Sequence, residues 1–299
     1  MRGEASRSWW RGLGLLAPSW LVLGVLFVAP LFVLLSVSLH PADDVGNAQP
    51  IDNPHEYWMS RQPLDNYAQS MHRIFVDVQL RSLWLAIATT GLCLLIGYPV
   101  AYYIALVAPP SRKNLLLALA VIPFWTSFLI RVAAWRLILQ DQGVVNTWLL
   151  HLKLLHEPLK LLDTPLAVMI GLVYGELPYM ILPLYASLEK LDRSLLQAAA
   201  DLGAKPASAF WRVTAPLTMP GIIAGIVLVF IPGIGQFIVS DMLGGARTML
   251  IGNMIQDQFT AGRNKPMGAA LAFELTAMVL AMLGAYALYA RRAGVEAAL

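Results

Sequence analysis

Residues 190–221 read KLDRSLLQAAADLGAKPASAFWRVTAPLTMPG, the longest interval of mixed polarity between two strongly apolar segments. Asp192 and Ser194 are suitable helix N-caps, and Ser194 to Gln197 fits a capping box, which satisfies backbone N–H groups in the first turn. Gly203 stands where a left-handed residue commonly ends a helix. The sequence therefore predicts a first short helix that ends just before Gly203.

A second short helix follows in the same stretch. Pro206 suits its first turn, because the backbone N–H that proline lacks has no helical partner there. Pro216, Pro220 and Gly221 are expected to end this helix and to turn the chain back into apolar sequence. The stretch is thus predicted to be a helix, a sharp turn and a second helix, which together project from a membrane.

The composition indicates a protein that crosses a membrane several times. Of 299 residues, 58% are hydrophobic and 13% are charged, with a mean hydropathy of +0.63, whereas about a quarter of the residues of a soluble domain carry charge. The net charge of +3 is small and gives no reason to expect a nucleic-acid partner. The single cysteine, Cys93, lies in an apolar run, so we expect a buried side chain and neither a disulfide framework nor a thiolate metal site.

The apolar blocks predict an all-α membrane protein with six transmembrane helices. The first block is longer than the core of a signal peptide, usually about 7–15 residues, so we interpret it as an uncleaved first span, with a cleaved signal as the alternative. Residues 1–12 precede it, and residues 13–299 are expected to be a single transmembrane domain. The expected spans are residues 13–39, 80–107, 115–137, 165–188, 219–243 and 268–290.

Two polar segments between the spans are assigned to the outer face. Residues 40–78 form a periplasmic loop long enough to hold local structure, and residues 140–163 are amphipathic and are expected to lie along the outer surface. Arg131, near the outer end of the third span, is expected to extend toward the membrane interface. Lys and Arg are almost evenly divided between the two sides, so charge barely decides the orientation. Clusters at the short inner turns favour cytoplasmic termini.

A family resemblance is carried by QAAADLGA at residues 197–204, followed by FWRVTAPLTMPGI. This pattern resembles the EAA loop in the membrane subunit of bacterial ABC importers, with Gln197 where that family usually has Glu. The resemblance implies the type I (MetI-like) permease fold, cytoplasmic termini, and a loop at residues 189–218 whose coupling helix docks into an ATPase subunit. The residues that it assigns to coupling are Gln197, Ala198, Ala199, Asp201, Leu202, Gly203, Ala204, Pro206 and Phe210.

Further segments, at residues 123–135, 171–192 and 237–259, resemble the PotB/PotH-type permeases for spermidine and putrescine. The resemblance implies polyamine uptake across the bacterial inner membrane; related permeases for ferric iron, sulfate, thiosulfate or phosphonates are the alternative. It also implies membrane lipid around the helices and three kinds of protein partner. These partners are a second permease subunit (PotC/PotI-like), two ATP-binding-cassette ATPase subunits and a periplasmic substrate-binding protein.

Catalytic signatures are missing from the sequence. It contains no G-x-x-x-x-G-K-[ST], G-x-S-x-G or H-E-x-x-H motif, and its histidines have no metal-ligand spacing. We therefore expect no enzyme activity, no metal and no cofactor in this chain, with ATP used by the partner subunit. A secondary transporter or channel driven by an ion gradient is the rival hypothesis.

Glu176 is the candidate for contact with a transported cation. It lies at the centre of the fourth span, about 18 Å from either end. A carboxylate at that depth costs on the order of 3 kcal/mol and should face the bundle interior or a wet cavity. Tyr179, one helical turn later, could add a cation–π contact to the charge pairing. The alternatives are that Glu176 pairs with Arg131 or a base of a partner subunit, or is protonated.

The fifth span is interrupted at Pro232-Gly233-Ile234-Gly235-Gln236, which predicts a kink or an unwound turn. Such breaks often line a substrate cavity, although a kink for packing is equally consistent. Asp241 is either a cation contact or a capping residue, and Trp125 either stacks on substrate or lies at the interface. The candidate pathway residues are therefore Glu176, Tyr179, Trp125, Gln236 and Asp241.

Overall fold

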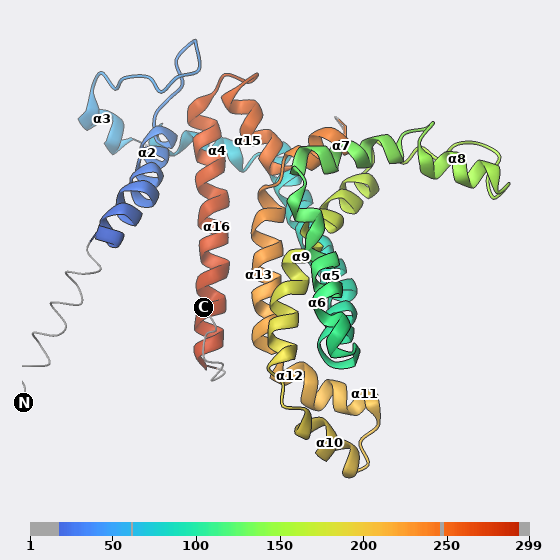
Figure 1. Ribbon diagram of the computed structural model, residues 1–299. Coiled ribbons are helices and arrows are strands. Elements are labelled where there is room, and N and C mark those ends of the chain that lie inside the picture. Colours follow the sequence, from blue (N-terminus) through green and yellow to red (C-terminus); the bar gives the residue numbers. More distant parts are fainter. Residues whose placement is uncertain (1–17, 61, 246–247, 293–299) are drawn as a thin grey trace, which may run out of the picture. The chain divides into compact units, whose positions relative to one another are not determined.

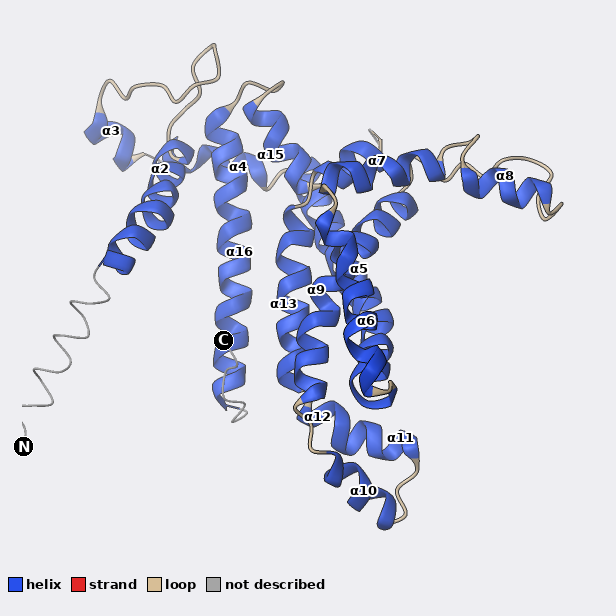
Figure 2. Cartoon of the chain, in the orientation of Figure 1, coloured by secondary structure: helices blue, strands red, loops and turns tan. Residues whose placement is uncertain are grey.

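The computed structural model describes residues 18–60, 62–245 and 248–292. Figure 2 shows that this part of the chain consists of helices and loops, with a single isolated bridge between Ala42 and Ala48. The all-α class predicted from the sequence is confirmed. The predicted N-terminal segment, residues 1–12, lies outside the described residues.

The chain divides into two compact units, which we describe separately. Among the described residues, unit 1 comprises those within 18–75 and 255–278, and unit 2 those within 76–254 and 279–292. Two helices, α15 (Ile251–Phe259) and α16 (Lys265–Arg292), contribute to both units. The sixth predicted span is confirmed by α16.

The first span belongs to unit 1. A helix covers Pro18–Ser38, with a π-helical segment η1 (Gly24–Val28) followed by α2 (Ala29–Ser38). Most of its large apolar side chains are exposed, including Phe27 and Phe32. A helix with so little of its apolar surface covered by its own chain suits a lipid environment.

The loop after the first span folds as predicted into local structure, with α3 (Pro54–Met59), η2 (Gln62–Leu64) and α4 (Asp65–Ser70). Asn66 Nδ2 donates to the carbonyl oxygens of Ser38 and His40 at 2.8 and 2.9 Å, and Tyr57 Oη donates to Leu39 O at 2.6 Å. These bonds satisfy the C-terminal carbonyls of the first span. The loop ends earlier than residue 78, because helix α5 already begins at Arg73.

Unit 2 is organised around helix α9 (Pro165–Glu189), the predicted fourth span (Figure 1). Along one part of α9, buried apolar residues join it to α5 (Arg73–Tyr102), α7 (Phe128–Leu139) and α14 (Ile238–Leu243). Along the rest, a second apolar cluster joins it to α5, η3 (Tyr103–Val107) and α13 (Met219–Gly235). Cys93 is fully buried in this second cluster, as expected.

Small residues let these helices approach closely. A Cβ atom on Gly225 of α13 would lie 2.5 Å from Met180 Sδ of α9, and one on Gly221 would lie 2.4 Å from Ser187 Cβ. Both distances are shorter than any van der Waals contact. At Gly221 the added atom would also lie 2.7 Å from the Pro183 carbonyl oxygen, so the α9–α13 packing requires glycine there, whereas at Gly225 the flexible Met180 side chain would have to move. Close packing over small side chains is the usual way in which transmembrane helices associate.

The prediction of a continuous third span at residues 115–137 is wrong. Helix α6 (Pro110–Val121) continues into the 3₁₀ turn η4 (Ile122–Trp125), and the chain is extended at Thr126 and Ser127 before α7. The segments Pro110–Trp125 and Phe128–His151 are bent by 92°. The apolar pattern continues across the break, so hydropathy alone could not reveal it. Helix α8 (Val144–His151) follows in the segment predicted to be amphipathic.

The predicted interruption of the fifth span is confirmed. Pro232 remains inside α13, and the helix ends at Gly235, where Gln236 adopts an extended conformation before α14 begins. Among the described residues, four helices are long and apolar enough to cross a membrane, and the number rises to six if each of two bent pairs forms one span.

Candidate functional site

A projecting helical hairpin follows the C-terminal end of α9 (Figure 1). Its first helix is α10 (Arg193–Asp201), and Asp192 Oδ1 accepts a hydrogen bond from Ser194 N at 2.9 Å. Asp192 is therefore the N-cap, and Ser194 lies inside the helix. The capping box predicted from Ser194 to Gln197 is not formed. The Ser194 N–H bond is the main reason that the pKa of Asp192 lies below its usual value.

Gly203 ends α10 as predicted. Its φ is +78°, in the left-handed region, and Gly203 N and Ala204 N donate to the carbonyls of Ala200 and Ala199. A Cβ atom at Gly203 would meet nothing within 4 Å. Glycine is therefore favoured here by the backbone conformation and not by lack of space.

The second helix begins at Pro206, as predicted, and consists of α11 (Pro206–Ala209), the π turn η5 (Phe210–Thr214) and α12 (Ala215–Leu217). Pro216 does not end the helix directly, since the helix passes through it to Leu217. The π turn η5 directly precedes α12, so the regular α-helical bonding is interrupted just before Pro216. The chain then bends by 68° into α13.

The hairpin exposes apolar side chains. Leu202, beside the turn, is 89% exposed, and Trp211 is 72% exposed. Large apolar side chains held on a projecting element indicate a surface that another protein covers. Of the residues assigned to coupling, Ala199, Ala204 and Phe210 are half-buried, and the exposed ones are Gln197, Ala198, Asp201, Leu202, Gly203 and Pro206.

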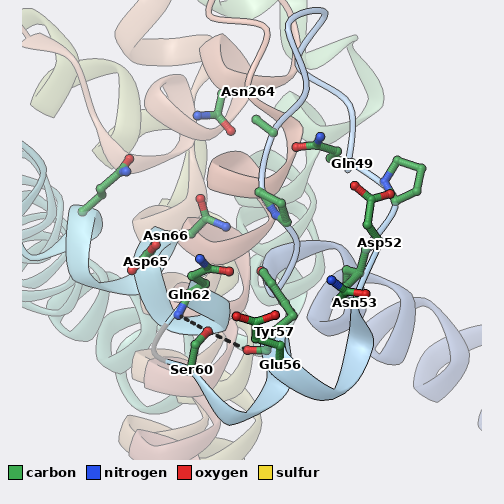
Figure 3. Close-up of a pocket in the computed structure, with 15 residues that line it drawn as sticks. Gln49, Asp52, Asn53, Glu56, Tyr57, Ser60, Gln62, Asp65, Asn66 and Asn264 are labelled. Carbon is green, nitrogen blue, oxygen red and sulfur yellow. Dashed lines mark hydrogen bonds between the residues drawn. The ribbon is translucent and has the colours of Figure 1, made fainter.

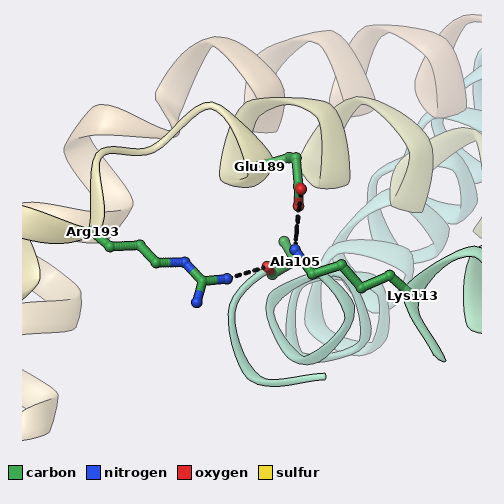
Figure 4. Close-up of polar contacts among 4 residues, drawn as sticks. All are labelled: Ala105, Lys113, Glu189 and Arg193. Carbon is green, nitrogen blue, oxygen red and sulfur yellow. Dashed lines mark hydrogen bonds and ion pairs between the residues drawn. The ribbon is translucent and has the colours of Figure 1, made fainter. Parts of the chain in front are cut away.

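Two polar contacts hold the base of the hairpin against the neighbouring helices (Figure 4). Arg193 Nη2 donates to Ala105 O in η3 at 3.1 Å, and Lys113 Nζ of α6 pairs with Glu189 Oε2 at 2.9 Å. The ion pair is partly exposed and contributes roughly 0.2–1 kcal/mol. The contact from Arg193 links the start of α10 to the end of the second span.

Phe210 connects the second hairpin helix to α5. Its ring meets those of Tyr98 and Tyr102 edge-to-face, with centroids 5.3 and 6.4 Å away. Tyr98 Oη also hydrogen-bonds Thr218 Oγ1, at the bend before α13, at 2.8 Å. A displacement of the hairpin would therefore push directly on two membrane helices, α5 and α13.

A second cluster surrounds Glu176 at the centre of α9. Glu176 is 4% exposed, and its Oε2 has no hydrogen-bond partner among the described residues. Arg131 of α7 is close enough to interact with it electrostatically, but the two form no ion pair in the described structure. The Arg131 guanidinium carbon lies 5.4 Å from the ring centroid of Phe124 and 5.6 Å from that of Phe128. Tyr179 stacks edge-to-face on Phe124 at 4.6 Å.

The position of Arg131 corrects one expectation. Its Nε and Nη1 atoms are buried without hydrogen-bond partners among the described residues, so the side chain does not extend to the interface. The expectation assumed a straight third span, whereas the 92° bend before α7 gives this helix, and with it Arg131, a different direction. Helical spacing could not have revealed this setting, because the chain breaks between Phe124 and Phe128.

The other predicted pathway residues lie outside this cluster. Trp125 is 88% exposed beside the break that precedes α7. Gln236 is half-buried at the break between α13 and α14, and Asp241 is exposed on α14. The structure therefore brings together Glu176 and Tyr179 of the five candidates.

The comparisons with known proteins identify the family. Residues 94–295 match the model of the "Binding-protein-dependent transport system inner membrane component". The chain belongs to this family. It is the permease component of an ABC importer, a multi-pass inner-membrane protein that is not itself catalytic and that works with ATPase and binding-protein partners.

Two relatives and one solved structure show how far the similarity extends. The permease is 41% identical to the spermidine/putrescine permease PotB of Haemophilus influenzae, over 90% of this chain and 89% of that protein. It is 47% identical to the spermidine/putrescine permease PotB of Escherichia coli, over 75% of this chain and 81% of that protein. A bacterial ABC transporter involved in alginate import shares the fold, with a TM-score of 0.70 at 17% identity and coverage of 97% and 98%.

Unit 1 of the permease contains a polar hollow of about 780 Å³ between α3, α4 and the adjacent loops (Figure 3). Asp52, Glu56 and Asp65 line it together with amide side chains, and none of the described residues that line it is basic. Burial raises the pKa of Tyr57 in its wall, and the charge of Asp65 adds to this effect. Three carboxylates, with no basic side chain among the described lining residues, favour a cation over an anion in this hollow.

Proposed function

We propose that this permease imports polyamines of the spermidine and putrescine class. The relatives named above as spermidine/putrescine permeases support this substrate class. In this chain, the supporting observation is the buried Glu176, whose Oε2 has no hydrogen-bond partner among the described residues, on the same helix as Tyr179, which packs on Phe124. A chain of ammonium groups binds favourably to carboxylates and to aromatic faces. We assign Glu176, Tyr179, Trp125, Gln236 and Asp241 to the pathway.

Uptake by the complete transporter tests the substrate. Proteoliposomes that contain the permease with its partners should accumulate radiolabelled spermidine or putrescine only with the binding protein outside and ATP inside. Ferric iron, sulfate, thiosulfate and phosphonate are the competing substrates in the same assay. Accumulation of one of these without polyamine uptake would overturn the assignment, as would polyamine uptake driven by an ion gradient without ATP.

We further propose that the hairpin at residues 189–218 is the coupling element and lies in the cytoplasm with both termini. Its coupling residues would dock into one of two ATPase subunits, a PotC/PotI-like permease would complete the pathway, and a periplasmic binding protein would deliver the substrate. The support is the hairpin itself, which combines an exposed Leu202, a fixed turn at Gly203 and contacts from Phe210 to α5.

A charge at the turn tests the coupling surface. Gly203→Asp should abolish uptake while leaving the protein inserted, because it places a carboxylate at the docked surface. Gly203→Asn is the matched control, since it has nearly the same shape and tolerates the left-handed conformation comparably. It should retain most of the uptake. Normal uptake by the Asp variant would contradict the coupling role, and equal loss in both variants would assign the effect to the backbone.

A further inference from the structure

Glu176 and Arg131 have opposite charges and lie close enough to interact electrostatically, yet each keeps buried polar atoms without a hydrogen-bond partner among the described residues. Glu176 Oε2 and two guanidinium nitrogens of Arg131 are buried without hydrogen-bond partners among the described residues. Buried Arg and carboxylate groups normally form bidentate hydrogen bonds, and a buried charged group left without a partner costs stability. The unpartnered atoms of these two neighbouring groups retain hydrogen-bonding capacity that a third group can use.

The surroundings of these two groups are those of a cation site. Arg131 lies over both the Phe124 and the Phe128 rings, and Tyr179 contacts Phe124. A Cβ atom at Gly175 of α9 would lie 3.5 Å from Phe128 Cε2, an ordinary van der Waals distance, so the Phe128 ring packs against α9 one residue before Glu176. Aromatic faces around a positive charge, with a carboxylate beside them, form the usual site for organic ammonium ions.

We propose that Glu176, Phe124, Phe128 and Tyr179 form a binding site for a primary ammonium group, which Arg131 of the same chain occupies in this conformation. This inference rests on the proposed function for the identity of the cation. An arriving ammonium group displaces the guanidinium from the two rings and donates hydrogen bonds to Glu176 Oε2. Tyr179, which is 41% exposed, marks the open side of the site.

Displacement of an internal cation has a functional consequence. The guanidinium competes for the same rings and the same carboxylate, so it weakens substrate binding and promotes release. Once the ammonium group has displaced it from the rings, the long Arg131 side chain can extend its guanidinium toward the membrane–water interface. Arg131 is therefore a specificity-determining and release-promoting residue, and removing its charge should strengthen binding instead of weakening it.

Equilibrium binding of radiolabelled spermidine tests this inference. The assay uses the purified permease with its membrane and ATPase partners, without the binding protein, in lipid nanodiscs. Arg131→Gln should lower the spermidine Kd by about tenfold or more, a change of roughly 1.4 kcal/mol and within the range of one cation–π contact. Arg131→Lys should stay near wild type. Glu176→Gln should abolish binding in both the wild-type and the Arg131→Gln background.

Arg136→Gln is the matched control, because it removes the same charge from an exposed position on the same helix. It should leave the Kd unchanged. The inference is overturned if Arg131→Gln binds spermidine no more tightly than wild type, if Arg136→Gln gives the same gain, or if the gain persists with Glu176→Gln.

A second measurement applies if Arg131→Gln does not assemble. Spermidine should then raise the thermal unfolding midpoint of the wild-type complex but not that of Glu176→Gln, and equal shifts or no shift would overturn the inference. Uptake separates the two proposals. Binding that follows the predicted pattern without polyamine uptake would remove the proposed function and keep the cation site. Polyamine uptake without that binding pattern would keep the proposed function and remove the cation site.

Discussion

At the residue scale, Asp192 shows how one side chain fixes the start of the hairpin at residues 189–218. Its carboxylate accepts the Ser194 N–H, which would otherwise lack a partner in the first turn of α10. The same bond favours the ionised carboxylate and holds the pKa of Asp192 below its usual value of 3.8. The stabilisation is therefore fully present above that value, and it is lost as the pH falls through the lowered pKa.

This titration predicts a pH-dependent protection of α10. Amide hydrogen exchange, corrected for intrinsic chemistry, should show constant protection of this helix at neutral pH and a loss once the pH falls below 3.8. Asp192→Asn keeps an N-cap oxygen but does not titrate, so its protection should not change over the same range. An identical loss in the Asn variant would assign the effect to another group.

Residue-scale features differed in how well they could be predicted. The left-handed conformation of Gly203 follows from local sequence, because a glycine after a helical run is the common C-cap. The prediction of a capping box at Ser194 was wrong, because Asp192, two residues earlier, is an equally good N-cap and the helix begins after it. The setting of Arg131 depends on the direction of α7, which no local pattern determines.

At the element scale, Phe210 is the aromatic contact between the hairpin and α5, and we propose that the hairpin acts on the membrane helices through it. Its ring lies between the hairpin and Tyr98 and Tyr102 of α5. Since a conformational signal must pass through contacts that differ between two states, we expect loss of this ring to uncouple the hairpin from the spans.

Phe210→Ala should therefore reduce uptake at least about tenfold, a difference of roughly 1.4 kcal/mol in transition-state free energy, while the ATPase subunits still co-purify with the permease. Tyr98→Phe is the mild control, because it keeps the ring contact and removes only the hydrogen bond to Thr218, worth about 0.5–1.5 kcal/mol. Normal uptake by Phe210→Ala, or loss of the ATPase subunits from the complex, would contradict this role.

Elements that are long and uniformly apolar were predicted well. The fourth span at α9 and the sixth at α16 match the expected ranges closely. The third span failed, because Pro123, Thr126 and Ser127 break the helix without lowering the hydropathy of the segment. Charged residues at the start of α5 had the opposite effect, since they concealed a helix that begins at Arg73.

At the scale of the whole molecule, the chain is the membrane subunit of a transporter in which a separate ATPase subunit hydrolyses ATP. The family assignment covers residues 94–295, which include the hairpin and the Glu176 cluster. The fold could be predicted because membrane spans appear in the sequence as continuous apolar runs, and the hairpin at residues 189–218 appears as one contiguous motif. The Glu176 cluster could be predicted only in part, because it is assembled from α9 and from η4 and α7, which a bend separates.

The central claim is that the hairpin at residues 189–218 docks on the ATPase subunit. The single native cysteine, Cys93, is fully buried, so one cysteine can be introduced at a chosen surface position without interference. Leu202→Cys places it at the most exposed apolar side chain of the hairpin, and Leu154→Cys, at a position 66% exposed after α8, is the control.

Cysteine cross-linking in the assembled transporter therefore tests the account most directly. With a short bifunctional thiol–amine reagent, Leu202→Cys should form a covalent adduct with the ATPase subunit, and nucleotide should change the yield. Leu154→Cys should form none with that subunit. An assembled, active transporter in which Leu202→Cys never cross-links to the ATPase, or in which Leu154→Cys does so instead, would contradict the account.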